Sequence, residues 1–140
     1  MDISLEISQR AKHIQDVLDK YMPPVEGYQR TIFDAMNYSV KAGGKRIRPM
    51  LMEATYKMFG GNDKIIEPFM AAMEMIHTYS LVHDDLPAMD NDEYRRGRKT
   101  THVVYGEANA ILAGDALLTE AFFVAANAPL SPERLVKAIS

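Results

Sequence analysis

Acidic side chains suited to binding a divalent cation are concentrated in the middle of the chain. Five acids lie between Asp84 and Glu93, with no basic residue among them. Hard divalent cations prefer oxygen ligands, and Mg²⁺ commonly takes one or two carboxylates together with the phosphates of a substrate. Asp84, Asp85 and Asp90 therefore predict a Mg²⁺ site. The stretch does not fit an EF-hand, because a loop that starts at Asp90 has Arg95 where that motif requires glycine.

The acidic stretch follows an apolar segment with helical periodicity, so a helix positions its first members. Each helical residue turns by ~100°, which places Asp84 within about 20° of the face that carries His77 and Ser80. Pro87 would clash with the carbonyl of the preceding turn, so we expect the helix to end or bulge there. That break could bring Asp90 back toward Asp84. A plainer alternative is that the acids are solvated or pair with the arginines that follow them.

Two basic clusters could bind phosphate oxygens. The first follows a glycine pair and holds Lys45, Arg46 and Arg48, and the second runs from Arg95 to Lys99. Ammonium and guanidinium groups both suit phosphate oxygens, and the guanidinium donates through a fork. The first cluster is not a P-loop, because Arg46 stands where that motif needs Ser or Thr. With the acids, the two clusters predict a site for a pyrophosphate-like anion, bound partly through metal and partly directly.

The elements that must position these residues are predicted to be helices. Apolar residues recur at helical spacing in residues 5–21, 32–40, 50–59, 65–86 and 108–128. Ser131, Pro132 and Glu133 are typical of one more helix start. No segment alternates convincingly with period two, and strong hairpin signals are absent. The sequence therefore predicts an all-α fold with no linker that would separate two domains.

Composition narrows the function classes further. With 140 residues, of which 47% are hydrophobic and 25% charged, the chain has the composition of a soluble globular domain. It contains no cysteine, which excludes thiol catalysis and cysteine-ligated zinc. The net charge of −3 and the acids that interrupt the bases argue against nucleic-acid binding. The first residues are unlike a signal peptide, and we expect no membrane span, because no apolar run approaches ~20 residues.

Four segments, in this order and spacing, resemble the trans-prenyl diphosphate synthases. They are residues 44–49, the Asp84-Asp85 pair followed after four residues by Asp90, residues 95–97 and residues 108–118. The resemblance is closest to farnesyl diphosphate synthases of the bacterial type. Two features favour that type: four residues separate the aspartates, and the aromatic Tyr79 lies five positions before Asp84. The resemblance implies the all-helical isoprenoid (polyprenyl) synthase fold.

The resemblance also implies roles for individual residues. Asp84 and Asp90 would bind Mg²⁺, with Asp85 beside them, and Arg95 would contact the allylic diphosphate. Tyr79 would form the floor of the pocket into which the product chain grows. The diphosphate of isopentenyl diphosphate would be held by Lys45, Arg48, His77 and Arg96. Without the resemblance, a core histidine and a core aromatic remain the alternatives for His77 and Tyr79.

The implied reaction is a Mg²⁺-dependent head-to-tail condensation of isopentenyl diphosphate with dimethylallyl or geranyl diphosphate to give farnesyl diphosphate. A geranylgeranyl or other short-chain synthase is the alternative within enzymes, and a half-domain with a structural or interaction role is the alternative outside them. Family members are about twice this length and carry a second aspartate-rich motif that the chain lacks. We therefore expect residues 1–140 to be the N-terminal half of one helical domain, inactive alone. The resemblance further implies a cytoplasmic enzyme that forms a homodimer when complete.

Two features outside the motifs carry expectations of their own. Asp115 lies in an apolar helix, where an ionised group needs a partner, so we expect a structural bond there. Gly114 beside it costs helix stability of ~1 kcal/mol relative to alanine, which favours close helix packing as its reason. Arg98 and Lys99 are expected to form a solvated rim.

Overall fold

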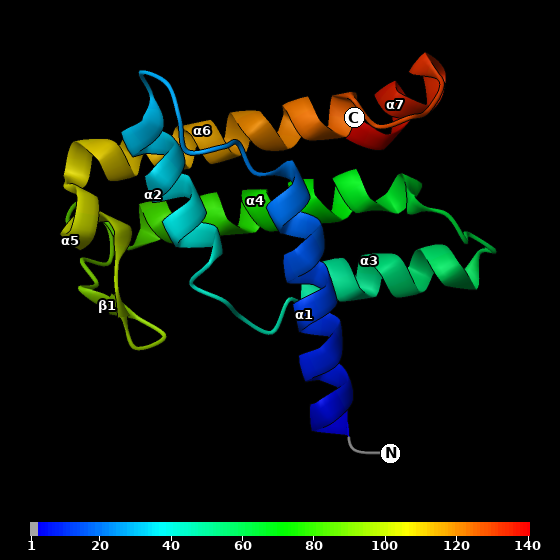
Figure 1. Cartoon of the computed structure of the whole chain (residues 1–140), viewed down its shortest axis with the longest axis horizontal. Helices are drawn as coiled ribbons and strands as arrows, with labels where there is room; N and C mark the ends of the chain where they lie inside the picture. The colour runs from blue at the N-terminus through cyan, green and yellow to red at the C-terminus, as the bar shows by residue number, and fades with distance from the viewer. Residues whose placement is uncertain (1–2) are drawn as a thin grey trace. The chain divides into compact units, whose positions relative to one another are not determined.

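The computed structural model describes residues 3–140, and the predicted all-α fold is confirmed (Figure 1). The helices are α1 (Ile3–Tyr21), α2 (Arg30–Val40), α3 (Ile47–Met58), α4 (Glu67–Asp84), α5 (Thr101–Tyr105), α6 (Glu107–Ala126) and α7 (Pro132–Ile139), with a 3-10 turn η1 (Lys64–Ile66) before α4. Residues 1 and 2 lie outside the described residues. They begin the segment whose sequence is unlike a signal peptide.

The chain divides into two compact units, each assembled from separate stretches of sequence. The first unit comprises residues 1–21, 43–74 and 121–140, and the second comprises residues 22–42 and 75–120. Buried side chains of the first unit include Ile14, Leu18 and Met70. Those of the second include Met36 and Leu117. Burying such a side chain fully is worth about 1.5–3 kcal/mol, so each unit has an apolar core of its own.

Proline, glycine and capping residues account for most helix ends. The helix that leads to the acidic stretch ends at Asp84, three residues before Pro87, as the proline predicts. The last helix starts with Pro132 directly after Ser131, which has extended backbone as an N-cap requires. The expected helix over residues 65–86 begins as η1 and continues as α4, because the Asp63 carboxylate accepts the Ile65 N–H and caps the 3-10 turn.

A short hairpin and a short helix were not predicted. Strand β1 (Tyr94–Arg95) pairs antiparallel with β2 (Arg98–Lys99), and the turn between them is Arg96-Gly97. Both turn residues have positive φ, 53° and 76°, as a two-residue hairpin turn of type I′ requires. Such turns are usually marked by Asn-Gly or Asp-Gly, so an Arg-Gly pair gives a weak sequence signal. Helix α5, with five residues, is too short to show a helical period.

Helix α6 is longer and more apolar than the sequence-based expectation allowed. Its 20 residues suffice by length and composition to cross a membrane, so the statement that no apolar run approaches that length is wrong. Several of its side chains are buried in the protein, among them Ala110, Ala113 and Leu117. The core helix of a globular domain can have the same length and composition, and α6 contributes to the core through these side chains, although only 39% of its apolar stretch is buried.

Candidate functional site

The acidic loop after α4 folds back on the helix that precedes it. The backbone N–H of Asp90 donates to the carbonyl of Asp84 at 2.8 Å, and the N–H of Asn91 donates to the carbonyl of Leu86 at 3.0 Å. Asn91 has φ 55°, in the left-handed region that asparagine tolerates better than most residues. The expected return of Asp90 toward Asp84 is therefore confirmed at the level of the backbone.

The side chains of Asp84 and Asp90 fit the ligand chemistry of Mg²⁺. Asp84 is half-buried and Asp90 is exposed, and neither forms a salt bridge within the described residues 3–140. Over the same residues, no group of three or more His, Asp or Glu side chains is gathered as a complete metal cage. Mg²⁺ usually takes only one or two carboxylates and completes its shell with water and phosphate, so two carboxylates at one loop are a fitting donor set.

Asp85 has a different environment from its neighbours. It is buried, and its carboxylate accepts two hydrogen bonds from Arg95 Nε, at 2.9 and 3.0 Å, and one from Nη2 at 2.7 Å. The Asp85 carboxylate beside the guanidinium raises the pKa of Arg95 above its ordinary value. The pairing of an acid with a following arginine, which the sequence left open, is thus realised for Asp85. The Asp85 carboxylate thus holds Arg95, the second residue of strand β1 in the unpredicted hairpin.

The basic cluster of the first unit separates into one buried and two exposed side chains. Arg46 is buried, with Nη1 donating to Glu74 Oε1 and Nη2 to Gln15 Oε1, both at 2.6 Å. The suggestion that Arg46 offers donors to a phosphate is therefore wrong, because its guanidinium is enclosed by protein partners. Lys45 and Arg48 are exposed on either side of it. Both remain available to an anion from solvent.

The predicted aromatic and histidine of α4 belong to the second unit, as do the acidic loop and the hairpin. Tyr79 and His77 are half-buried. The Tyr79 ring contacts His83 edge-to-face, with ring centroids 5.5 Å apart and an interplanar angle of 86°. His83 Nε2 lies 3.1 Å from the Ile111 carbonyl of α6. A carbonyl only accepts, so Nε2 carries the proton in this bond.

Gly114 lets the His83 ring approach α6. A Cβ built at Gly114 would overlap the ring at Nε2, which confirms close packing as the reason for this glycine. Asp115 lies beside it with its side chain 63% exposed, and its Oδ1 is 3.8 Å from His83 Nε2. The expectation of a structural bond for Asp115 assumed a buried carboxylate. That assumption is wrong, because the carboxylate faces solvent.

We expect Gly114→Ala to lower the free energy of unfolding by up to about 2 kcal/mol. Overpacking against the His83 ring costs about 1–3 kcal/mol, which exceeds the helix propensity gained from alanine, about 1 kcal/mol. Denaturant unfolding of the purified chain measures the difference. The double variant Gly114→Ala/His83→Ala should recover part of the loss, since it removes the ring. A Gly114→Ala variant as stable as the parent would show that the ring moves aside freely.

Arg98 and Tyr38 form contacts that the sequence did not indicate. Arg98 Nη1 donates to the Lys41 carbonyl at 2.9 Å, and its guanidinium lies 4.5 Å from the centroid of the Tyr38 ring. The Tyr38 hydroxyl donates to the Lys99 carbonyl at 2.7 Å. Arg98 is exposed, as the expected solvated rim requires, and it also joins the hairpin to α2. Lys99 itself is exposed, as expected.

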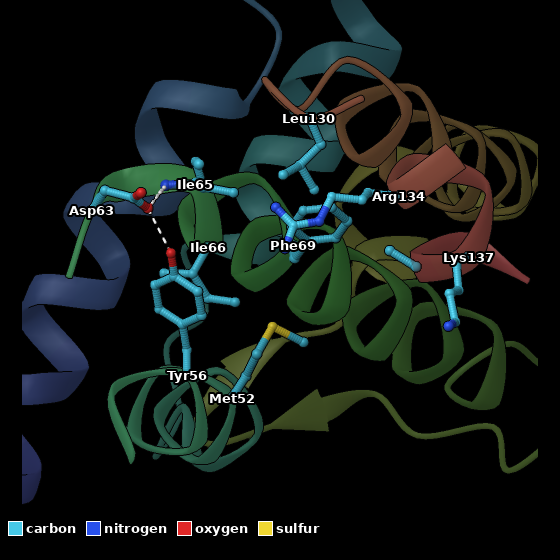
Figure 2. Close-up of a pocket in the computed structure, with 10 residues that line it drawn as sticks. Met52, Tyr56, Asp63, Ile65, Ile66, Phe69, Leu130, Arg134 and Lys137 are labelled. Atoms are coloured by element: carbon cyan, nitrogen blue, oxygen red, sulfur yellow. Dashed lines mark hydrogen bonds between the residues drawn. The ribbon is translucent and has the colours of Figure 1, made fainter. Parts of the chain in front are cut away.

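The first unit contains an apolar cavity of about 580 Å³ that none of the predicted site residues lines (Figure 2). Figure 2 shows its polar end, where the Asp63 carboxylate accepts from the Tyr56 hydroxyl at 2.6 Å and from the Ile65 N–H at 3.0 Å. These hydrogen bonds lower the pKa of Asp63, and the bond to Asp63 raises the pKa of Tyr56. Arg134 and Lys137 of α7 also line this cavity, whose other lining side chains are mostly apolar.

Comparisons with known proteins agree with the motifs. The family model described as polyprenyl synthetase matches residues 29–140. The chain is 56% identical over 119 residues to the farnesyl diphosphate synthase of Micrococcus luteus, covering 85% of the chain and 40% of that protein. It is 50% identical over 129 residues to the geranylgeranyl diphosphate synthase of Cyanophora paradoxa, covering 91% of the chain and 42% of that protein. The chain thus spans less than half the length of these relatives.

A solved structure supports the same assignment at the level of the fold. The crystal structure of an FPP/GFPP synthase from Zymomonas mobilis superposes with a TM-score of 0.89 at 36% sequence identity. The match covers 97% of this chain and 50% of that one. The family match includes the acidic loop, the hairpin of residues 94–99 and most of the helices, and the chain therefore belongs to the polyprenyl synthetase family.

Proposed function

We propose that this chain supplies the metal-binding and diphosphate-binding residues of a trans-prenyl diphosphate synthase that makes farnesyl diphosphate. The observation that carries the proposal is the backbone hydrogen bond from the Asp90 N–H to the Asp84 carbonyl. This bond closes a loop that has a carboxylate residue at each end. The same unit then presents Arg95 and Arg96 on a hairpin. Carboxylates beside arginines suit a Mg²⁺-bound diphosphate, because the metal and the guanidinium groups both contact phosphate oxygens.

Asp84 and Asp90 are the residues that would hold Mg²⁺. When bound, the metal neutralises charge on the allylic diphosphate and so makes it a better leaving group. Asp85 has another task in this proposal, since its buried carboxylate fixes Arg95. The partly exposed guanidinium of Arg95 still reaches solvent, with 31% of its side chain accessible, and can contact the allylic diphosphate.

The remaining cationic groups would hold isopentenyl diphosphate. Lys45, Arg48 and Arg96 are exposed, and His77 is half-buried on α4. Their part is to position the double bond of isopentenyl diphosphate against the allylic carbon and to balance the charge of two diphosphates. As the new carbon–carbon bond forms, diphosphate leaves the allylic carbon with the electrons of the carbon–oxygen bond, and loss of a proton from the resulting carbocation gives the product.

The product length is proposed from one side chain. Tyr79, held edge-to-face by His83, would close the pocket for the growing chain and stop elongation at farnesyl diphosphate. The relatives include proteins named as farnesyl and as geranylgeranyl diphosphate synthases, so a geranylgeranyl synthase is the alternative. Replacing Tyr79 by alanine separates the two, because a shortened side chain at the pocket floor should give longer products.

The proposal treats the 140 residues as part of an enzyme that needs further sequence for activity. The relatives of known name are more than twice as long as the matched segment, and we propose that a second wall of the active site lies in the additional sequence. A cytoplasmic homodimer is the expected state of such a complete enzyme. A half-domain with a structural or interaction role is the alternative, and it predicts no diphosphate binding.

A condensation assay tests the proposed function. The chain replaces the matching segment of the Micrococcus luteus farnesyl diphosphate synthase, and the hybrid is incubated with labelled isopentenyl diphosphate, geranyl diphosphate and Mg²⁺. We expect farnesyl diphosphate from the hybrid and no product from the 140-residue chain alone. A folded hybrid without activity would contradict the enzyme assignment, and product from the chain alone would contradict the proposal that further sequence is needed.

A further inference from the structure

The hairpin formed by residues 94–99, here called the arginine hairpin, needs support from outside itself. Each of its strands has only two residues, and an isolated two-stranded hairpin is marginally stable at best. Its turn also places Arg96 at φ 53°, where a residue with a Cβ is disfavoured. Such a conformation costs about 1–3 kcal/mol and persists only where surrounding contacts fix it.

One support comes from Asp85, the residue directly after α4, and holds strand β1. Asp85 accepts three hydrogen bonds from the Arg95 guanidinium, and the Asp85 side chain is only 6% exposed. This ion pair fixes the side chain of the β1 residue that precedes the turn. The hydrogen bonds of this ion pair involve no residue of β2, which is held by a second support.

Tyr38 of α2 provides the second support. Its hydroxyl donates to the Lys99 carbonyl at 2.7 Å, and its ring faces the Arg98 guanidinium at 4.5 Å. Arg98 is held further by the Lys41 carbonyl, which accepts from Nη1 at 2.9 Å. Tyr38 therefore contacts both residues of β2, one through its hydroxyl and the other through its ring.

The orientation of Tyr38 is fixed in turn by α5. Its ring meets Tyr105 edge-to-face, with centroids 5.5 Å apart and an interplanar angle of 68°. The Tyr105 hydroxyl donates to Asp34 Oδ2 at 3.0 Å, and Ser39 and Thr101 share a hydroxyl–hydroxyl bond of 2.8 Å. Partial burial, the hydrogen bond to Asp34 and the negative charge of Asp34 raise the pKa of Tyr105 to about 12, so the Tyr105 hydroxyl stays a donor at neutral pH.

We infer that Tyr38 is a positioning residue for diphosphate binding, because it fixes β2 and thereby sets where Arg96 presents its guanidinium. The inference rests on the proposed function for the role of Arg95 and Arg96. Tyr38 contacts no reacting group in this account and acts through the arginine hairpin. A guanidinium binds phosphate best through a fork of fixed direction, so a loosened hairpin loses affinity even with both arginines present.

The test compares two variants that each lose one hydroxyl and keep the ring. Tyr38→Phe removes the bond to the Lys99 carbonyl, and Tyr56→Phe, the matched control, removes a hydroxyl bond to Asp63 within the first unit. The affinity for inorganic pyrophosphate with Mg²⁺ is measured by calorimetry. We expect Tyr38→Phe to weaken binding roughly threefold to tenfold, the range that corresponds to one lost hydrogen bond, and Tyr56→Phe to leave it unchanged.

A second measurement decides the inference without any ligand. Amide hydrogen exchange of residues 94–99 should accelerate in Tyr38→Phe and stay at the parent rate in Tyr56→Phe. Equal exchange and equal affinity in both variants would overturn the positioning role. If the parent chain itself binds no pyrophosphate, the diphosphate-binding proposal fails, and unchanged exchange in Tyr38→Phe would still refute the support of the hairpin separately.

Discussion

Replacing Asp84 by asparagine should weaken the Mg²⁺-dependent binding of inorganic pyrophosphate by roughly 100-fold or more. Removing a residue that only hydrogen-bonds to a metal ligand already lowers metal affinity 10- to 100-fold in typical cases, and Asp84 is proposed as a direct ligand. Asparagine keeps the size and one oxygen but removes the negative charge that a hard cation prefers. Because the backbone carbonyl of Asp84 accepts the Asp90 N–H, the loop itself should survive the substitution.

Asp92→Asn is the matched control for that experiment. Asp92 lies in the same acidic loop and is exposed, and its backbone carbonyl, not its carboxylate, accepts the hydrogen bond from Thr100 Oγ1 at 2.7 Å. We expect its effect on pyrophosphate affinity to be no more than a few-fold, from the lost charge alone. Equal losses in both variants would mean that the loop attracts Mg²⁺ through its general charge, and Asp84 would then not be a ligand.

The largest expected effect on stability concerns the buried pair between Arg46 and Glu74. Glu74→Ala should lower the free energy of unfolding by about 3–5 kcal/mol, because it leaves the Arg46 guanidinium buried without its anion. The side chains of the pair are only 3% and 5% exposed, and the atoms that join them are 2.6 Å apart. Denaturant unfolding of the chain measures the loss.

Two comparisons keep this result interpretable. Glu6→Ala removes the anion of an exposed pair with Arg10 and should cost no more than about 1 kcal/mol. The double variant Arg46→Met/Glu74→Met should recover much of the stability, since apolar residues of similar volume often replace a buried ion pair without loss. A cost of Glu74→Ala as small as that of Glu6→Ala would show that the guanidinium reaches water or another acceptor.

Local sequence signals were sufficient for the helices other than α5 and for the return of the acidic loop. The helix stop before Pro87 follows from the missing amide and the ring clash of proline, and both act within one turn of the chain. Once α4 stops at Asp84, the chain has only a few residues in which to reach Asp90, and the backbone bond between the two follows. These features depend on neighbours in sequence, and the sequence therefore predicts them.

Features that depend on distant residues could not be predicted in the same way. Arg46 and Arg48 are chemically alike and two positions apart, yet one is buried against Glu74 and the other is exposed. The difference arises from packing in the first unit. Likewise, the role of Tyr38 follows from its bond to a residue 61 positions away, which no local pattern records.

The arginine hairpin shows a third kind of difference. Its turn requires positive φ at both central residues, and Gly97 meets this requirement without strain, whereas Arg96 does not. Sequence rules are built on unstrained turns, so they give little signal for a turn that external contacts impose. Arg96 therefore departs from the usual preference for glycine, asparagine or aspartate at positive φ, and it is also a residue of the proposed site.

Calorimetric titration of the parent chain with inorganic pyrophosphate, with and without Mg²⁺, tests the central claim most directly. The claim is that residues 84–96 bind a diphosphate through Mg²⁺ and arginine before any other part of an enzyme is added. We predict saturable binding with Mg²⁺ and much weaker binding when EDTA removes the metal. Absence of binding in both conditions by a chain that is folded by circular dichroism, or binding of equal strength with and without Mg²⁺, would contradict the claim.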